Sequence, residues 1–145
     1  MAEPAPIDIS KHCLAVRLRR MNRAVTAIYD DAIRPLGVKI SQLNILVVAD
    51  RRGEPTPSDV GRILHLEAST LSRNLERMRR RGWIESVPSA GDGRLQPFRL
   101  TDSGRRLLSE AHPMWKNAQE KASALLGEAT VKAIMSSPAA TLGKG

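Results

Sequence analysis

The sequence predicts a mainly α-helical fold with one small β-hairpin and a long helix near each end. Apolar residues recur every three or four positions through both ends of the chain, as on one face of a helix. Two short strand-like runs flank a glycine-containing segment, which is typical of a hairpin. The length of 145 residues and the 41% of hydrophobic residues suit one globular domain, or a small domain with an oligomerisation arm.

The first long helix is predicted between Lys11 and Leu36. Its apolar residues are separated by four and three positions in turn, and Pro35 and Gly37 end it. These apolar residues are Leu14, Leu18, Met21, Val25, Ile28 and Ala32. Such a stripe requires a partner helix, either in a second copy of the chain or in the same chain.

Three shorter helices are predicted next. One begins at Ser41 as its N-cap, and its apolar run over 43–48 predicts burial nearly all round. Another begins at Thr56-Pro57-Ser58-Asp59, which supplies a hydroxyl cap, a proline in the first turn and a carboxylate at the third position. The third runs from Ala68 to Arg81, with Gly82 as its stop. A short helix, a tight turn and a longer helix form a helix-turn-helix pattern.

The hairpin is predicted from runs at 83–87 and 95–100 on either side of the segment 89–94. Pro97 cannot donate a backbone hydrogen bond, so its strand should be short or lie at an edge. Thr101 then caps a second long helix, which Pro113 should kink. Its apolar stripe consists of Leu107, Ala111, Met114, Ala118, Ala122 and Leu125, and a short helix at 129–135 follows.

The charge of the chain points to a polyanionic partner. The net charge is +8, and half of it lies within residues 61–81. Aromatic residues make up 3% of the chain, too few for a platform that stacks single-stranded bases, so duplex DNA is favoured. The sequence shows no catalytic motif, no cofactor-binding loop and no apolar run long enough for a membrane, and the single cysteine suits a reducing compartment. We therefore expect a cytoplasmic protein that is not an enzyme and has no cofactor or metal site.

The helix over 68–81 has a face suited to the major groove. When Leu71, Leu75 and Met78 point to the core, the opposite face begins with small polar residues and ends with basic ones. That face consists of Ser69, Arg73, Glu76, Arg77 and Arg80, flanked by Thr70 and Ser72. Short side chains let a helix approach base edges, and arginine binds guanine or phosphate.

Two blocks carry a family resemblance. The first is Ser69-Thr70-Leu71-Ser72-Arg73, followed by Leu75-Glu76-Arg77 and Arg81-Gly82-Trp83-Ile84. The second is Asp92-x-Arg94 with Leu100-Thr101-x-x-Gly104. Together they resemble the MarR family of winged-helix transcriptional regulators over about residues 10–136. The resemblance implies a homodimer that binds a near-palindromic operator, with Ser69, Thr70, Ser72, Arg73 and Arg77 contacting bases or phosphates. It also implies that Arg94 enters the minor groove from the wing and that Asp92 orients it.

The resemblance divides the chain into an N-terminal arm and dimerisation helix (1–36), a winged helix-turn-helix lobe (37–101) and C-terminal dimerisation helices (102–145).

Family members commonly release DNA when a small, often phenolic, compound binds or when a cysteine is oxidised. The resemblance implies a repressor and allows a small phenolic or other aromatic effector, whose identity the sequence does not give. Trp115, Tyr29 and Met21 are candidate pocket residues if the long helices meet; packing in the core is the alternative that the sequence favours for them. Two alternatives stay open: a winged-helix module that binds an acidic protein, and a redox sensor acting through Cys13.

Overall fold

The computed structural model describes residues 1–2, 4–88 and 96–141. It confirms a mainly helical fold with one antiparallel hairpin. The helices are α1 (Ala5–His12), α2 (Leu14–Ile33), α3 (Ile40–Arg52), α4 (Pro57–Leu64), α5 (Ala68–Arg80), α6 (Asp102–Leu126) and α7 (Glu128–Ser136), with 3-10 turns at Arg34–Leu36 and Pro138–Ala140. The strands are β1 (Ile84–Ser86) and β2 (Phe98–Leu100), in which Glu85 pairs with Arg99.

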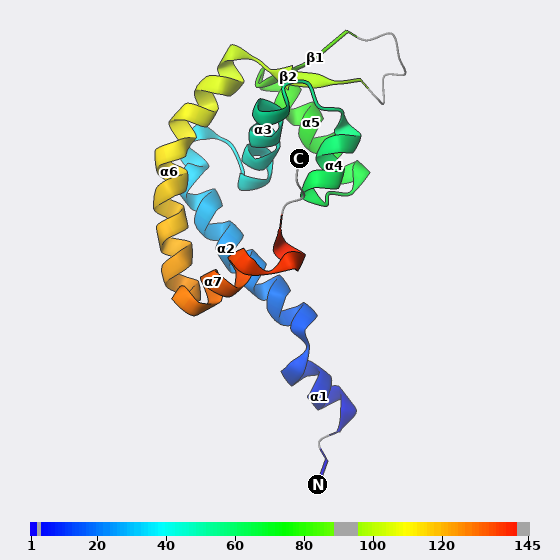
Figure 1. The fold of residues 1–145 in the computed structure, drawn as a ribbon, viewed down its shortest axis with the longest axis vertical. Helices are drawn as coiled ribbons and strands as arrows, with labels where there is room; N and C mark the ends of the chain where they lie inside the picture. Colours follow the sequence, from blue (N-terminus) through cyan, green and yellow to red (C-terminus); the bar gives the residue numbers. More distant parts are fainter. Residues whose placement is uncertain (3, 89–95, 142–145) are drawn as a thin grey trace.

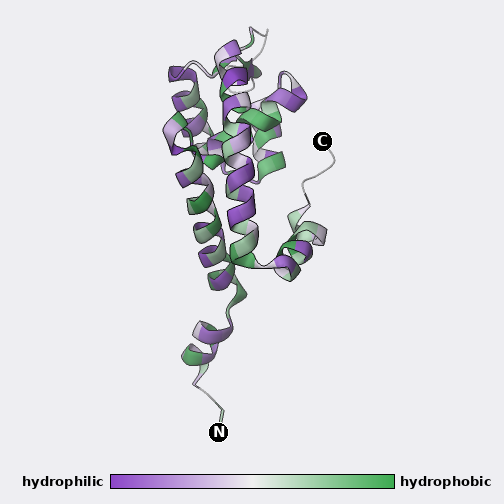
Figure 2. Cartoon of the chain, turned by 90° about the vertical axis from the view of Figure 1, so that its left-hand side faces the viewer, coloured by the Kyte–Doolittle hydropathy of each residue, from purple (hydrophilic) through white to green (hydrophobic). Residues whose placement is uncertain are grey.

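The two long helices form a stalk, and α3, α4, α5 and the hairpin form a lobe at one end of it. Figure 1 shows α2 and α6 side by side, with α3, α4, α5 and the hairpin gathered at the upper end and α1 extending from the lower end. Figure 2 shows hydrophilic and hydrophobic residues alternating along both long helices, as amphipathic helices require. Among the described residues no single helix is long and apolar enough to cross a bilayer. Taken together, the segments Ala5–Leu36 and Ile40–Arg52 have the length and composition of a membrane span, but the chain bends by 77° between them.

The core of the lobe is built around α3. Ile45 and Leu46 of α3 are fully buried together with Phe98 of β2. The predicted inner stripe of α5 is confirmed, because Leu71, Leu75 and Met78 are all buried. One face of α5 is therefore held by the core, which fixes the direction in which the opposite face points.

The helix-turn-helix follows the predicted local signals. The backbone N–H of Asp59 donates to Thr56 Oγ1 (3.2 Å), and the backbone N–H of Thr56 donates to Asp59 Oδ2 (3.0 Å), a complete capping box at the start of α4. His65 ends α4 in the left-handed region, with φ of 52°. Gly82 follows α5 with φ of 75°, which glycine adopts without strain.

The prediction for the start of α3 was wrong. Ser41 lies inside the helix, and the cap is Lys39. The first backbone N–H groups are satisfied from elsewhere: Ile40 N donates to Asp30 Oδ1 of α2 (2.8 Å), and Lys39 N donates to Gln42 Oε1 (3.1 Å). Burial all round α3 was also wrong, since Val47 is 42% exposed.

The helices near both ends of the chain also differ from prediction. The first long helix is broken at Cys13, whose ψ of 111° is extended, so residues 5–12 form a separate helix. The helix α6 contains Pro113 and extends to Leu126, so the proline does not end it, and the predicted kink stays a prediction. Leu125 is 59% exposed and does not join the buried stripe of α6.

Candidate nucleic-acid interface

The candidate residues on α5 share one exposed surface. Ser69, Ser72, Arg73 and Arg77 are exposed, and Thr70 is half-buried at the edge of the same surface. The small residues lie in the first turns of the helix and the arginines follow them. The structure thus brings together every candidate residue of the recognition helix. Asp92 and Arg94, the candidate residues of the wing, lie outside the described residues.

The arginines of this region differ in what they contact. Arg80 Nη2 donates to Glu76 Oε1 at 2.5 Å, which partly neutralises its charge. Arg81 lies over the ring of Trp83, 4.7 Å from its centroid, and Arg81 Nη1 donates to Gly37 O at 3.5 Å. Within the part of the chain that the structure describes, Arg73, Arg77 and Arg79 form no ion pair. Their guanidinium groups present an unneutralised positive charge, which attracts a polyanion.

The root of the hairpin is held by an ion-pair network that the sequence did not reveal. Arg99 Nε donates to Glu85 Oε1 on the opposite strand (2.9 Å), and Arg99 Nη1 donates to Glu54 Oε1 (3.5 Å). The hydrogen bond and charge of Glu85 raise the pKa of Arg99 above its ordinary value. The strand register was the missing signal, because it places opposite charges side by side.

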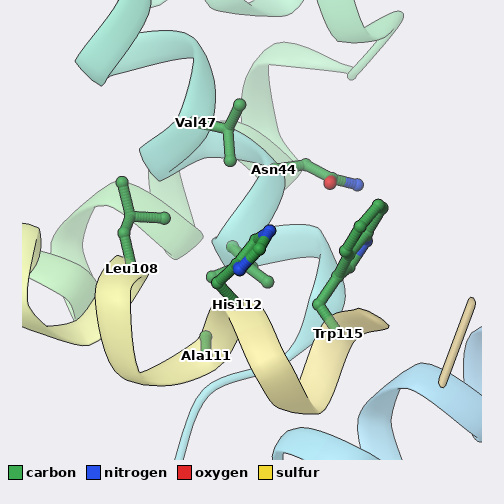
Figure 3. A pocket seen from close by; sticks show the side chains of 7 residues that line it. Asn44, Val47, Leu108, Ala111, His112 and Trp115 are labelled. Carbon is green, nitrogen blue, oxygen red and sulfur yellow. The ribbon is translucent and has the colours of Figure 1, made fainter. Parts of the chain in front are cut away.

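A cavity of about 310 Å³ lies between α3 of the lobe and α6 of the stalk. Figure 3 shows its walls: Asn44 and Val47 come from α3, and Leu108, Ala111, His112 and Trp115 come from α6. The rings of His112 and Trp115 are stacked, with centroids 6.1 Å apart and planes inclined by 19°. The candidate pocket residue Trp115 therefore lines a cavity with an aromatic wall.

The other two candidate pocket residues lie elsewhere. Met21 and Tyr29 line a separate groove of about 570 Å³ between α2, α6 and α7. The hydroxyl of Tyr29 donates to Gln119 Oε1, and burial raises the pKa of Tyr29. Met21 and Tyr29 therefore line a different pocket from Trp115, because the groove is bounded by α2 and α7, whereas the cavity is bounded by α3.

Cys13 lies at the junction of α1 and α2, where it is a free, half-buried thiol. Figure 1 places this junction at the end of the stalk remote from the lobe. Among the described residues no three His, Cys, Asp or Glu side chains are grouped so that they could hold a metal ion.

The chain is similar in sequence to known transcriptional regulators. Residues 36–95 match the sequence pattern of the MarR family. The HTH-type transcriptional regulator PecS of Dickeya dadantii is 27% identical over 110 residues, which cover 74% of this chain and 66% of PecS. The multiple antibiotic resistance protein MarR of Salmonella typhimurium is 26% identical over 92 residues, covering 63% of this chain and 64% of that protein. The chain thus spans slightly less than two thirds of the length of these relatives.

Two solved structures extend the comparison. The Mycobacterium tuberculosis regulator MosR, crystallised with DNA, is 34% identical, with a TM-score of 0.71 over 81% of this chain and 85% of MosR. A mutant MarR of Escherichia coli with operator DNA has the same fold, with a TM-score of 0.76 at 20% identity over 88% of this chain and 91% of that one. On the match over residues 36–95 and the similarity to MosR, the chain belongs to the MarR family of winged-helix transcriptional regulators.

Proposed function

We propose that this protein is a homodimeric repressor that binds duplex DNA through the outward face of α5. The observation that carries the proposal is the pair Arg73 and Arg77, exposed on the side of α5 opposite its buried stripe and unpaired among the described residues. A surface arginine without an ion-pair partner can bind a phosphate, or the O6 and N7 atoms of guanine, without first breaking another contact. MosR and E. coli MarR, both solved with DNA, support this function.

The order of residues along α5 suits insertion into a major groove. Ser69 and Ser72 are short, so the first turns of the helix can approach base edges closely. Thr70, Arg73 and Arg77 follow at positions that reach bases or the flanking phosphates. From the wing, we propose that Arg94 enters the adjacent minor groove and that Asp92 orients its guanidinium.

The dimer is proposed from apolar surface that a single chain leaves exposed. Leu14 and Leu18 in α2 are 73% and 60% exposed, and Met135 of α7 is 74% exposed. Contiguous exposed apolar residues on a soluble protein mark an association surface. A second copy would cover them and present two lobes to adjacent major grooves, so the operator would be near-palindromic. Residues 1–36 and 102–145 would then form the dimerisation region, with the DNA-binding lobe at 37–101.

The cavity between α3 and α6 is the proposed effector site. Its volume lies at the lower end of the usual range for small-molecule sites, and its stacked His112 and Trp115 rings suit a flat aromatic or phenolic compound. A compound bound there would contact both the lobe and the stalk, so it could alter the spacing of the two lobes and release the operator. A cytoplasmic location follows from this function. A redox role for Cys13 stays a prediction.

The test compares two arginines of the same helix. Arg73→Ala should lower operator affinity and reduce the dependence of binding on salt. Arg80→Ala should have a smaller effect, because the Arg80 guanidinium already donates to Glu76 and is less available to DNA than that of Arg73. Arg73→Glu should abolish specific binding, and Arg94→Ala should weaken binding with the dimer intact. Affinities are measured by fluorescence anisotropy across a salt series, with sedimentation for the dimer. Equal effects of Arg73→Ala and Arg80→Ala would contradict the proposal.

A further inference from the structure

Glu76 stands out on the proposed DNA-binding face, because it is the one carboxylate on α5. The helix otherwise carries four arginines, at positions 73, 77, 79 and 80. The side chain of Glu76 is 61% exposed, so it makes no contribution to the core. A negative group among these arginines opposes binding to phosphates, and a surface that needed only general affinity for DNA would not include it.

The position of Glu76 places it within the groove-facing surface. It follows Ser69 by seven residues, which turns it about 20° around the helix axis and moves it about 10 Å along the axis. It also follows Arg73 by three residues, on the neighbouring turn. When Ser69 and Arg73 meet DNA, Glu76 therefore faces the same groove from the next turn of the helix beyond Arg73.

The contact with Arg80 orients the carboxylate. Arg80 Nη2 donates to Glu76 Oε1 at 2.5 Å, while Glu76 Oε2 has no hydrogen-bond partner among the described residues. Exposed pairs at this spacing add little to stability, so helix stability alone gives Glu76 a small role. The pair does hold the side chain in one orientation, with one oxygen available as an acceptor.

We propose that Glu76 determines specificity by accepting a hydrogen bond from the N4 amino group of a cytosine. A carboxylate is purely an acceptor, and cytosine N4 is a major-groove donor to which glutamate side chains bind. Facing guanine or thymine, Glu76 would lose its water without gaining a donor. Facing adenine, it would gain the N6 donor but would lie beside the N7 acceptor, which repels a carboxylate. It therefore disfavours incorrect sequences as well as favouring the correct one. This inference rests on the proposed binding of DNA by α5.

The experiment measures binding of the full-length protein to its selected operator duplex and to single-base variants of that duplex. Glu76→Ala should reduce discrimination at one C·G pair in each half-site by about 5- to 150-fold, and binding to scrambled duplex should tighten. Glu76→Gln should transfer the preference at that pair toward adenine, since glutamine pairs with adenine N6 and N7. Arg80→Ala should weaken the preference without changing the preferred base, because the carboxylate remains but loses the contact that orients it. Glu110→Ala on α6 removes the same charge far from the groove and is the matched control.

The outcomes separate this inference from the proposed function. If Arg73→Ala loses operator affinity while Glu76→Ala keeps every base preference of the wild type, the inference is overturned and binding by α5 stands. If Arg73→Ala is also without effect, the proposed function fails and the inference fails with it. Unchanged circular dichroism and unfolding temperature in each variant establish that the fold is intact. If Glu110→Ala tightens binding to scrambled duplex as much as Glu76→Ala does, net charge explains the tighter binding. That result would also overturn the inference.

Discussion

Replacement of Gly104 by alanine is predicted to disturb the junction between the stalk and the lobe. Gly104 is buried in the first turn of α6, close to the backbone of Trp83. A Cβ atom added there would lie 2.2 Å from the carbonyl oxygen of Trp83 and 3.1 Å from its carbonyl carbon. Both atoms belong to the backbone, so no side-chain rotation can relieve the overlap, and the chain itself must move.

The cost can be worked out from the contacts at this junction. Overpacking of a buried site destabilises a protein by about 1–3 kcal/mol. The Trp83 carbonyl also accepts a hydrogen bond from Thr101 N at 3.0 Å, and Thr101 Oγ1 accepts one from Gly104 N at 3.1 Å. Loss of one of these bonds adds about 1 kcal/mol. We therefore expect Gly104→Ala to lower the free energy of unfolding by about 2–4 kcal/mol.

The assay is urea unfolding followed by circular dichroism, at one fixed protomer concentration because the stability of the proposed dimer would depend on that concentration. Ser109→Ala, an exposed change in the same helix, is the control and should alter the free energy of unfolding by about 0.5 kcal/mol or less. A Gly104→Ala variant as stable as this control would refute the argument, because the backbone would then accommodate a Cβ without cost.

Three further predictions concern the cap of α4, the core and the dimer. Hydrogen bonds from Thr56 lower the pKa of Asp59 in the folded chain. The ionised Asp59 therefore stabilises the fold above about pH 4, and this stabilisation is lost as the pH falls through the folded-state pKa. In urea titrations at a series of pH values, Asp59→Asn should flatten the dependence of unfolding free energy on pH in acid, and an unchanged dependence would contradict this prediction. Phe98→Ala should cost about 3–5 kcal/mol of unfolding free energy, because Phe98 is fully buried; a loss below about 1 kcal/mol would show that the core is wrongly placed. Leu14→Ser with Leu18→Ser should weaken the dimer in sedimentation experiments without changing the helix content, and an unaffected dimer would exclude this surface.

Features set by neighbouring residues could be predicted from the sequence. The capping box of Thr56 and Asp59 and the stop at Gly82 depend on side chains and backbone within a few positions, so their patterns predict the structure directly. The buried stripe of α5 could also be predicted, because apolar residues at helical spacing all point to one side of the helix, where the core lies. These features place the outward face of α5 correctly, including Arg73 and Arg77.

Features set by distant residues could not be predicted. Ser41 has the right chemistry for a cap, yet Asp30, ten residues earlier on α2, satisfies the start of α3. Val47 and Leu125 continue apolar runs, but the single chain leaves them without a covering element. The sequence also could not distinguish Arg80, which Glu76 neutralises, from the unpaired Arg73, because the rotamers decide between them. The proposed roles of Asp92 and Arg94 stay predictions.

Binding of DNA by α5 is tested most directly by selecting duplexes from a random library with the wild-type protein and with Arg73→Ala. The affinities of both proteins for the selected duplex and for a scrambled duplex are then measured across a salt series. We expect a pseudo-palindrome with half-sites about one helical turn apart, and a sequence preference that Arg73→Ala loses. Binding that depends on salt but not on sequence, or a preference that Arg73→Ala leaves unchanged, would contradict the assignment of α5 as the element that reads DNA.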